Sequence, residues 1–188
     1  MQHAKFQIMN TSYIKTPIIR AMLYFSRQMI LEQYPGKSHL MWKNVSFVIK
    51  TSPWQFSGHC SPYARHIRMK IGTPEVFPLT STYRGGREYK DMPPYTYHDY
   101  LEACLAIIAH EMSHFIWQTH TRDNEEACEC LSMKVLKLYR QDRWGIKTRI
   151  YNLVAGKLAS AAKTEPFVKE SETGTVKENV GNDSAVQQ

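Results

Sequence analysis

The sequence predicts one α+β domain in which a helix is followed by a small β-sheet and then by two helices that carry the candidate functional residues. A chain of 188 residues, 43% of them hydrophobic, is long enough for one compact core. Apolar residues recur at helical spacing near both ends of this domain, and short β-rich segments lie between them. We therefore assign the folded domain to residues 1–162 and expect a disordered polar tail at residues 163–188.

The first predicted element is a helix over residues 16–34. Its apolar side chains recur every three or four residues, and Pro17 occupies the first turn, where proline is tolerated. Pro35 and Gly36 follow the last apolar residue of the pattern. This pair predicts the end of the helix.

Two strands are predicted after this helix. Residues 44–50 are rich in β-branched and aromatic side chains, and residues 66–71 alternate strictly between apolar and polar. The alternation predicts a strand with one wet face, which carries Arg68 and Lys70. Between the two strands, the composition of residues 58–64 predicts a turn.

A long surface connection is predicted at residues 72–94, which hold four prolines and a Gly-Gly pair. A helix then runs from Leu101 onward, with Asp99 as its N-cap and Glu102 three residues later in a capping-box arrangement. One apolar stripe of this helix faces the core, and the opposite side carries two histidines and is expected to be exposed only where they lie. The stripe consists of Leu101, Leu105, Ile108, Met112 and Phe115.

Two more helices complete the predicted domain. One begins after an N-cap at Asp123 and carries apolar residues at helical spacing as far as Leu138. The other is short and covers residues 147–162. The fold is then mainly helical with a small sheet.

The strongest chemical signal is the motif His110-Glu111-Met112-Ser113-His114, an HExxH sequence on a predicted helix. Side chains four residues apart lie one above the other on a helix, so both imidazoles can bind one ion. Neutral imidazole suits zinc, and a site with three protein ligands leaves a fourth position for water. We therefore expect one Zn²⁺ per chain, with His110 and His114 as ligands and Glu111 as the general base that takes a proton from the attacking water.

The third ligand is chosen among residues shortly after the motif. Glu125 is our prediction, because it lies at the edge of the apolar stripe of the following helix, whereas Glu126 points away. Glu129, one turn later, could accept an N–H from a ligating histidine and fix its tautomer. Glu129 itself, Asp123 and His120 are the other candidates for the third ligand, and His120 would need a turn that usually contains glycine.

These residues support a family resemblance. The string HEMSH, followed by a helix that starts NEEACECLSMKVL, resembles the small gluzincin-type zinc metallopeptidases. The upstream order of helix, strand, turn and strand is similar to the minimal fold of SprT-like and ImmA/IrrE-like metallopeptidases, over about residues 16–139. The resemblance implies a zincin-like fold, a zinc ion and peptide-bond hydrolysis. The ImmA/IrrE-like pattern has an acid followed closely by Ala-Asn, where this chain has Glu126-Ala127-Cys128, so Glu125 and Glu126 both stay open.

The net charge and the cysteine content limit which partners and which cellular compartment we expect. A net charge of +7 and a pI near 9.2 favour acidic partners, so nucleic-acid contact through a basic surface is a candidate interaction. No segment resembles a signal peptide or a transmembrane helix, which predicts a cytoplasmic protein without membrane contact. We expect reduced and mostly buried thiols rather than disulfides at the four cysteines, Cys60, Cys104, Cys128 and Cys130.

The sequence thus predicts a zinc-dependent endopeptidase that acts on a protein substrate. The alternative from a different class is a DNA-associated binding module whose zinc site is structural or degenerate.

Overall fold

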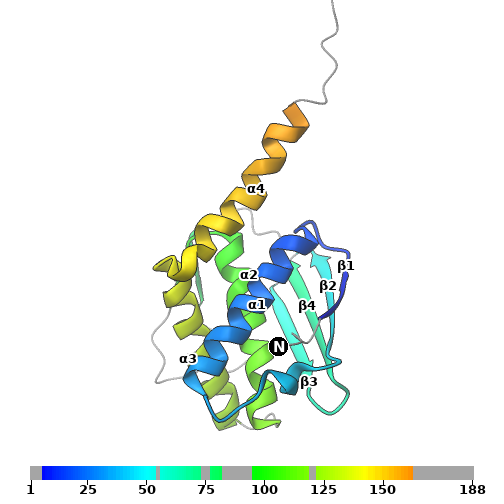
Figure 1. Cartoon of the computed structure of the whole chain (residues 1–188), viewed down its shortest axis with the longest axis vertical. Coiled ribbons are helices and arrows are strands. Elements are labelled where there is room, and N and C mark those ends of the chain that lie inside the picture. Colours follow the sequence, from blue (N-terminus) through cyan, green and yellow to red (C-terminus); the bar gives the residue numbers. More distant parts are fainter. Residues whose placement is uncertain (1–5, 54–55, 73–76, 82–94, 119–121, 163–188) are drawn as a thin grey trace, which may run out of the picture.

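The structure is a computed structural model that describes residues 6–53, 56–72, 77–81, 95–118 and 122–162 (Figure 1). The predicted tail at residues 163–188 lies outside the described residues. Helices and strands both contribute, as the predicted α+β class requires. In chain order the elements are β1 (Gln7–Asn10), α1 (Thr16–Gln33), the short 3-10 helix η1 (His39–Trp42), β2 (Ser46–Ser52), β3 (Ser57–Ser61), β4 (His66–Gly72), β5 (Leu79–Ser81), β6 (Tyr95–Tyr97), α2 (Tyr100–Trp117), α3 (Arg122–Arg140), the 3-10 helix η2 (Arg143–Gly145) and α4 (Ile146–Ala162).

The main sheet has four strands in the order β1-β2-β4-β3. Strands β1, β2 and β4 are parallel, and β3 runs antiparallel to β4 at the edge. Helix α1 connects the parallel strands β1 and β2, as a β-α-β crossover requires. The sheet lies beside the helices, and α4 projects from one end of the molecule (Figure 1).

The alternation of apolar and polar residues along each strand determines which face of the sheet is buried. In β4, Ile67, Met69 and Ile71 are buried, whereas Arg68 and Lys70 are exposed, which confirms the predicted wet face. The register places the buried Phe47 of β2 beside Ile67 of β4. One face therefore joins the core with the helices, and the other face carries polar side chains.

The turn prediction for residues 58–64 is wrong in its first half, because residues 57–61 form strand β3. This segment has little β propensity of its own, and its strand conformation comes from pairing with β4. The connection predicted at residues 72–94 is also interrupted, because residues 79–81 form β5, which pairs with β6. Strand β1 was not predicted; it is four residues long and is held by its parallel pairing with β2.

Helix α2 crosses the centre of the molecule. It contacts α1, α3 and the strands β3 and β4, and all five residues of its predicted apolar stripe are buried. Its N-cap is Asp99, as predicted, and this carboxylate accepts the N–H of Glu102 at 2.8 Å. The Glu102 carboxylate accepts the N–H of His98 at 2.8 Å, one residue before the position that a capping box uses.

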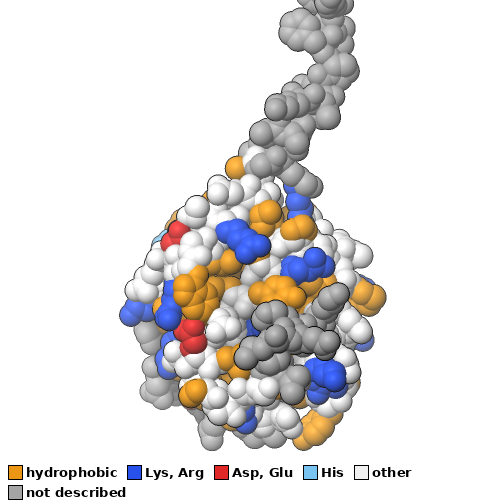
Figure 2. Space-filling model, viewed as in Figure 1, with side chains coloured by type: hydrophobic (Ala, Val, Ile, Leu, Met, Phe, Trp, Pro, Cys, Tyr) orange, Lys and Arg blue, Asp and Glu red, His pale blue; other side chains and the backbone are white. Residues whose placement is uncertain are grey.

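Helices α3 and α4 match their predicted positions except at one boundary. Helix α3 begins at Arg122, so Asp123 lies in its first turn and is not its N-cap. Helix α4 starts one residue before the predicted segment and ends at Ala162. Among the described residues, no helix is both long enough and apolar enough to cross a membrane. In the view of Figure 2 the acidic side chains lie on the α3 side, whereas Lys and Arg are spread more widely.

Candidate metal centre

The two histidines of the HExxH motif lie one turn apart on α2, and both rings face α3. Their ring centroids are 5.0 Å apart, with the planes nearly perpendicular. The side chain of His110 is 12% exposed and that of His114 only 2%. The expectation that the helix is exposed wherever the histidines lie is therefore wrong for His114, because α3 packs along this side of α2.

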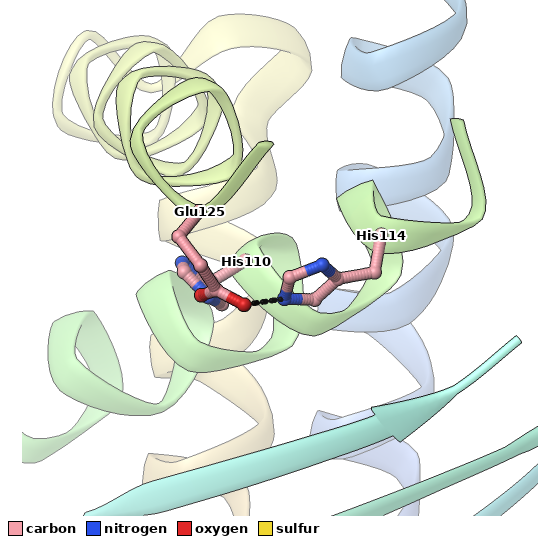
Figure 3. Close-up of side chains that lie close together, drawn as sticks. All are labelled: His110, His114 and Glu125. Carbon is pink, nitrogen blue, oxygen red and sulfur yellow. Dashed lines mark ion pairs between the residues drawn. The ribbon is translucent and has the colours of Figure 1, made fainter. Parts of the chain in front are cut away.

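Glu125, in the second turn of α3, reaches across to both histidines (Figure 3). Its carboxylate oxygens lie 3.3 Å from Nε2 of His110 and 3.6 Å from Nε2 of His114. The three ligand atoms all lie within 4.8 Å of one another. In a tetrahedral zinc site with bonds of about 2.0–2.1 Å, ligand atoms are separated by about 3.3–3.4 Å, so this donor set fits zinc.

The other candidates for the third ligand do not join this group in the described part of the chain. Glu126 is the next residue along α3, but the cluster of potential ligands contains only His110, His114 and Glu125. His120 and the side chain of Asp123 lie outside the described residues. The structure thus brings together the three ligands that the sequence predicted.

The second nitrogen of each histidine contacts α3. His110 Nδ1 lies 2.9 Å from a carboxylate oxygen of Glu129, which is buried, and donates a hydrogen bond to it. His114 Nδ1 lies 3.5 Å from the thiol of Cys128. With Nδ1 occupied in this way, each ring turns Nε2 toward Glu125, the orientation that a ligating histidine needs. Glu129 therefore has the position that the sequence suggested for orienting a ligand.

Glu111 of α2 points toward the edge strand β3. Its carboxylate is buried and lies directly over Gly58: a Cβ atom at position 58 would be 2.2 Å from Oε1 of Glu111 and 2.4 Å from its Cγ. These distances are far below van der Waals contact, so only glycine fits beneath the carboxylate in this arrangement. Gly58 itself is exposed, whereas the Glu111 side chain that lies over it is buried.

Two buried thiols line the same region. Burial raises the pKa of Cys60, on β3, and the negative charges of Glu111 and Glu125 raise it further. Burial likewise raises the pKa of Cys128, again with Glu125 and Glu111 as additional causes. Both thiols are protonated at neutral pH and act as small apolar groups, as expected. Cys130, by contrast, is exposed, so three of the four cysteines are buried, in line with the expectation of mostly buried thiols.

Sequence reasoning missed Gly58 and Cys60 because it assigned them to a turn. A usable signal was present: residues 62–65, which begin with a proline, form a short turn immediately before a clearly alternating strand. A short turn of this kind commonly connects antiparallel partners, so it predicts a strand on its other side as well. The contact between Cys128 and His114 had no comparable signal.

The site therefore combines a set of three potential ligands from two helices, imidazoles oriented by contacts with α3, and the carboxylate of Glu111 on the same helix as the histidines. Such an arrangement can hold a divalent metal and transfer a proton beside it. In comparisons with known proteins, no family model matches the chain, and no curated protein or solved structure is significantly similar to it.

Proposed function

We propose that the chain is a zinc-dependent metallopeptidase with a zincin-like fold, which binds one Zn²⁺ and cleaves protein substrates. The observation that carries this proposal is the convergence of His110, His114 and Glu125 from two helices, with Glu111 next to His110 in the sequence of α2. A bound zinc ion would supply Lewis acidity, which polarises a peptide carbonyl and lowers the pKa of water. The remaining steps fall to side chains of this chain.

Glu111 has the position of a general base. It adjoins His110 in sequence, its carboxylate is shielded from bulk water, and Gly58 leaves room for it. A carboxylate placed in this way takes a proton from water as the water attacks, and it can return that proton to the amine that leaves. Proton transfer of this kind contributes about 10²–10⁴ in rate.

The position of the edge strand β3 supports the proposal that the substrate is a peptide. Its only strand neighbour among the described residues is β4, so its other edge faces outward, next to Glu111. Exposed sheet edges bind extended peptides through main-chain hydrogen bonds, with little demand on side-chain sequence. An extended chain along β3 would bring its backbone carbonyls to the side of α2 that carries Glu111.

The first experiment measures zinc per chain by plasma mass spectrometry. Tag-free wild-type protein is compared with His114→Ala, Glu125→Gln and Glu126→Gln, all purified identically without chelator. We expect a ratio near one in the wild type and in Glu126→Gln, and a loss of zinc in the other two variants. Absence of zinc from all four proteins, or its loss in Glu126→Gln with retention in Glu125→Gln, would contradict the ligand assignment.

The second experiment tests catalysis. Wild-type protein and Glu111→Gln, both loaded with zinc, are incubated with a mixed peptide library, and new peptide ends are counted by mass spectrometry. We expect the wild type to cleave and Glu111→Gln to lose at least about 10²-fold in rate while it keeps its zinc. If zinc-loaded wild type cleaves nothing, the peptidase proposal fails, and the alternative of a binding module with a structural zinc site takes its place.

A further inference from the structure

The positive charge of this protein is concentrated in the part of the chain that builds the main sheet. Residues 1–74 contain ten Lys and Arg residues and a single acid, Glu32, whereas residues 75–188 contain slightly more acids than bases. Residues 33–74, which include β2, β3 and β4, hold no acid at all. Charge asymmetry of this size between two parts of one chain is typical of proteins that bind a polyanion.

The fold gathers part of this charge on the outer face of the sheet. We define the basic sheet face by Lys50 of β2, His59 of β3, and His66, Arg68 and Lys70 of β4. The register makes Lys50 the direct neighbour of Lys70, and it places His59 beside Arg68. Neighbouring strands are about 4.8 Å apart, so the three cations occupy a continuous surface across β2 and β4.

This arrangement is unfavourable for the isolated protein. Like charges directly opposite each other on neighbouring strands destabilise a sheet. Among the residues that the structure describes, no carboxylate lies within ion-pair distance of Lys50, Arg68 or Lys70, and all three side chains are exposed. A face that served stability alone would carry both signs, so the uniform sign indicates an external anion.

The hydrogen bonds of His66 show the effect of the positive charge on this face. Arg68 Nε donates to His66 Nε2 at 2.9 Å, and His66 Nδ1 lies 2.7 Å from the hydroxyl of Ser46. The imidazole must therefore be neutral, with its proton on Nδ1. Burial, followed by the charge of Arg68, lowers the pKa of His66 below its ordinary value of 6.5.

The polar character of the face favours nucleic acid over a membrane surface. Membrane-binding faces combine cations with large apolar side chains that enter the lipid. Among the described residues of this face, Met9 is the one large apolar side chain that is mostly exposed, at 63%. The turn between β3 and β4 adds Tyr63, an aromatic ring that is 84% exposed and available for stacking on a base.

We propose that the basic sheet face binds the phosphate backbone of single-stranded nucleic acid, with Tyr63 as a stacking platform at one end. This goes beyond the proposed peptidase function and does not depend on the metal site, because none of its residues belongs to the ligand cluster. It places a second binding surface on the strand β4, whose partner β3 borders Glu111.

The test is fluorescence anisotropy of a labelled 20-nucleotide thymidine strand at several salt concentrations. We compare the wild type with the triple variant Lys50→Thr, Arg68→Thr, Lys70→Thr, which keeps β propensity. Loss of three phosphate contacts should weaken binding at least about ten-fold at low salt and reduce the salt slope by about two. The matched control, Lys134→Gln, Lys137→Gln, Arg149→Gln, removes the same charge from exposed positions of α3 and α4 and should change affinity less than about two-fold.

Further measurements distinguish single-stranded nucleic acid from other ligands of the basic sheet face. Tyr63→Ser should weaken binding about five-fold or more without changing the salt slope. His114→Ala should bind like the wild type, so failure of the metal site leaves this result intact. Equal losses in the two triple variants would overturn the proposal, since net charge alone would then explain binding. Tighter binding to a duplex of the same length, or binding only to vesicles that contain phosphatidylserine, would overturn it as well.

Discussion

At the scale of single residues, the closest approach in the site is between Gly58 and Glu111. No side chain can occupy position 58 without displacing the carboxylate, because even a methyl group would overlap Oε1. The glycine is therefore a positioning residue for Glu111, and its effect should be separable from metal binding.

Gly58→Ala should lower peptidase turnover about 10²-fold, since a displacement of about 1 Å at a catalytic group has this effect. Zinc content should stay at one per chain, because Gly58 is not in the ligand cluster. Glu111→Asp shortens the side chain by one methylene, so it should recover part of the activity in the Gly58→Ala background. Steady-state kinetics on a peptide taken from the library experiment measures both effects.

Gly36→Ala is the matched control, because nothing lies within 4 Å of a Cβ atom built at that position. It should leave turnover unchanged. Unchanged turnover in Gly58→Ala would show that Glu111 does not act from the position seen here.

Like Gly58, Glu129 is expected to act indirectly, here through the ring of His110 that it contacts. Its hydrogen bond to His110 Nδ1 orients the ring, and orienting groups of this kind are worth about 10–100-fold in metal affinity. Glu129→Gln should therefore weaken zinc binding about ten-fold, as measured by competition with a chromophoric chelator. Glu126→Gln, one turn away on the same helix, is the comparison. If both variants bind zinc like the wild type, Glu129 has no orienting role.

At the scale of helices, Glu102 of α2 and Arg140 of α3 form an ion pair that joins these two elements. The carboxylate is 1% exposed, and Arg140 Nη2 donates to it at 2.6 Å. Burial alone would raise the pKa of Glu102, but the hydrogen bonds from Arg140 and from the His98 N–H outweigh it and hold this pKa below its ordinary value of 4.5. The ionised carboxylate therefore stabilises the fold above about pH 4.5, and this contribution is lost as the pH falls through the lowered pKa.

Arg140→Gln should lower the free energy of unfolding by about 2 kcal/mol at pH 7, because it leaves a buried carboxylate with fewer donors. The difference from the wild type should shrink as the pH falls below 4.5 and through the lowered pKa of Glu102. Urea unfolding at several pH values measures this difference in the free energy of unfolding. Arg143→Gln, which removes a more exposed pair with Glu32, should cost less than about 1 kcal/mol. A constant difference at all pH values would exclude Glu102 as its source.

Helices and strands differ in how far the sequence predicts them. The spacing of Leu101, Leu105 and Ile108 contains the whole signal for α2, because a helix forms its hydrogen bonds within one segment. Strand β3 forms its hydrogen bonds with β4, so residues such as Gly58 give no local indication of their state. The same distinction holds in the site: HExxH is local, whereas the approach of Gly58 to Glu111 depends on a sheet edge that only the fold creates.

At the scale of the whole molecule, the buried core thins out within α4. Among the residues whose burial the structure describes, Ile150 is the last buried one, early in this helix. A chain truncated after Ala162 should therefore melt within about 2 °C of the full-length protein and keep its zinc. Differential scanning calorimetry of both forms tests this. A large loss of stability would show that residues 163–188 contribute to the folded domain.

The ligand cluster also joins two helices, because two of its members belong to α2 and the third to α3. An ion bound there would act as a reversible cross-link, present only in the folded chain. By mass action, free zinc at 100 times its dissociation constant would add about 2.7 kcal/mol to the free energy of unfolding. The folded fraction would then depend on the zinc supply of its surroundings, and scarcity of the metal would reduce the lifetime of the protein as well as its activity.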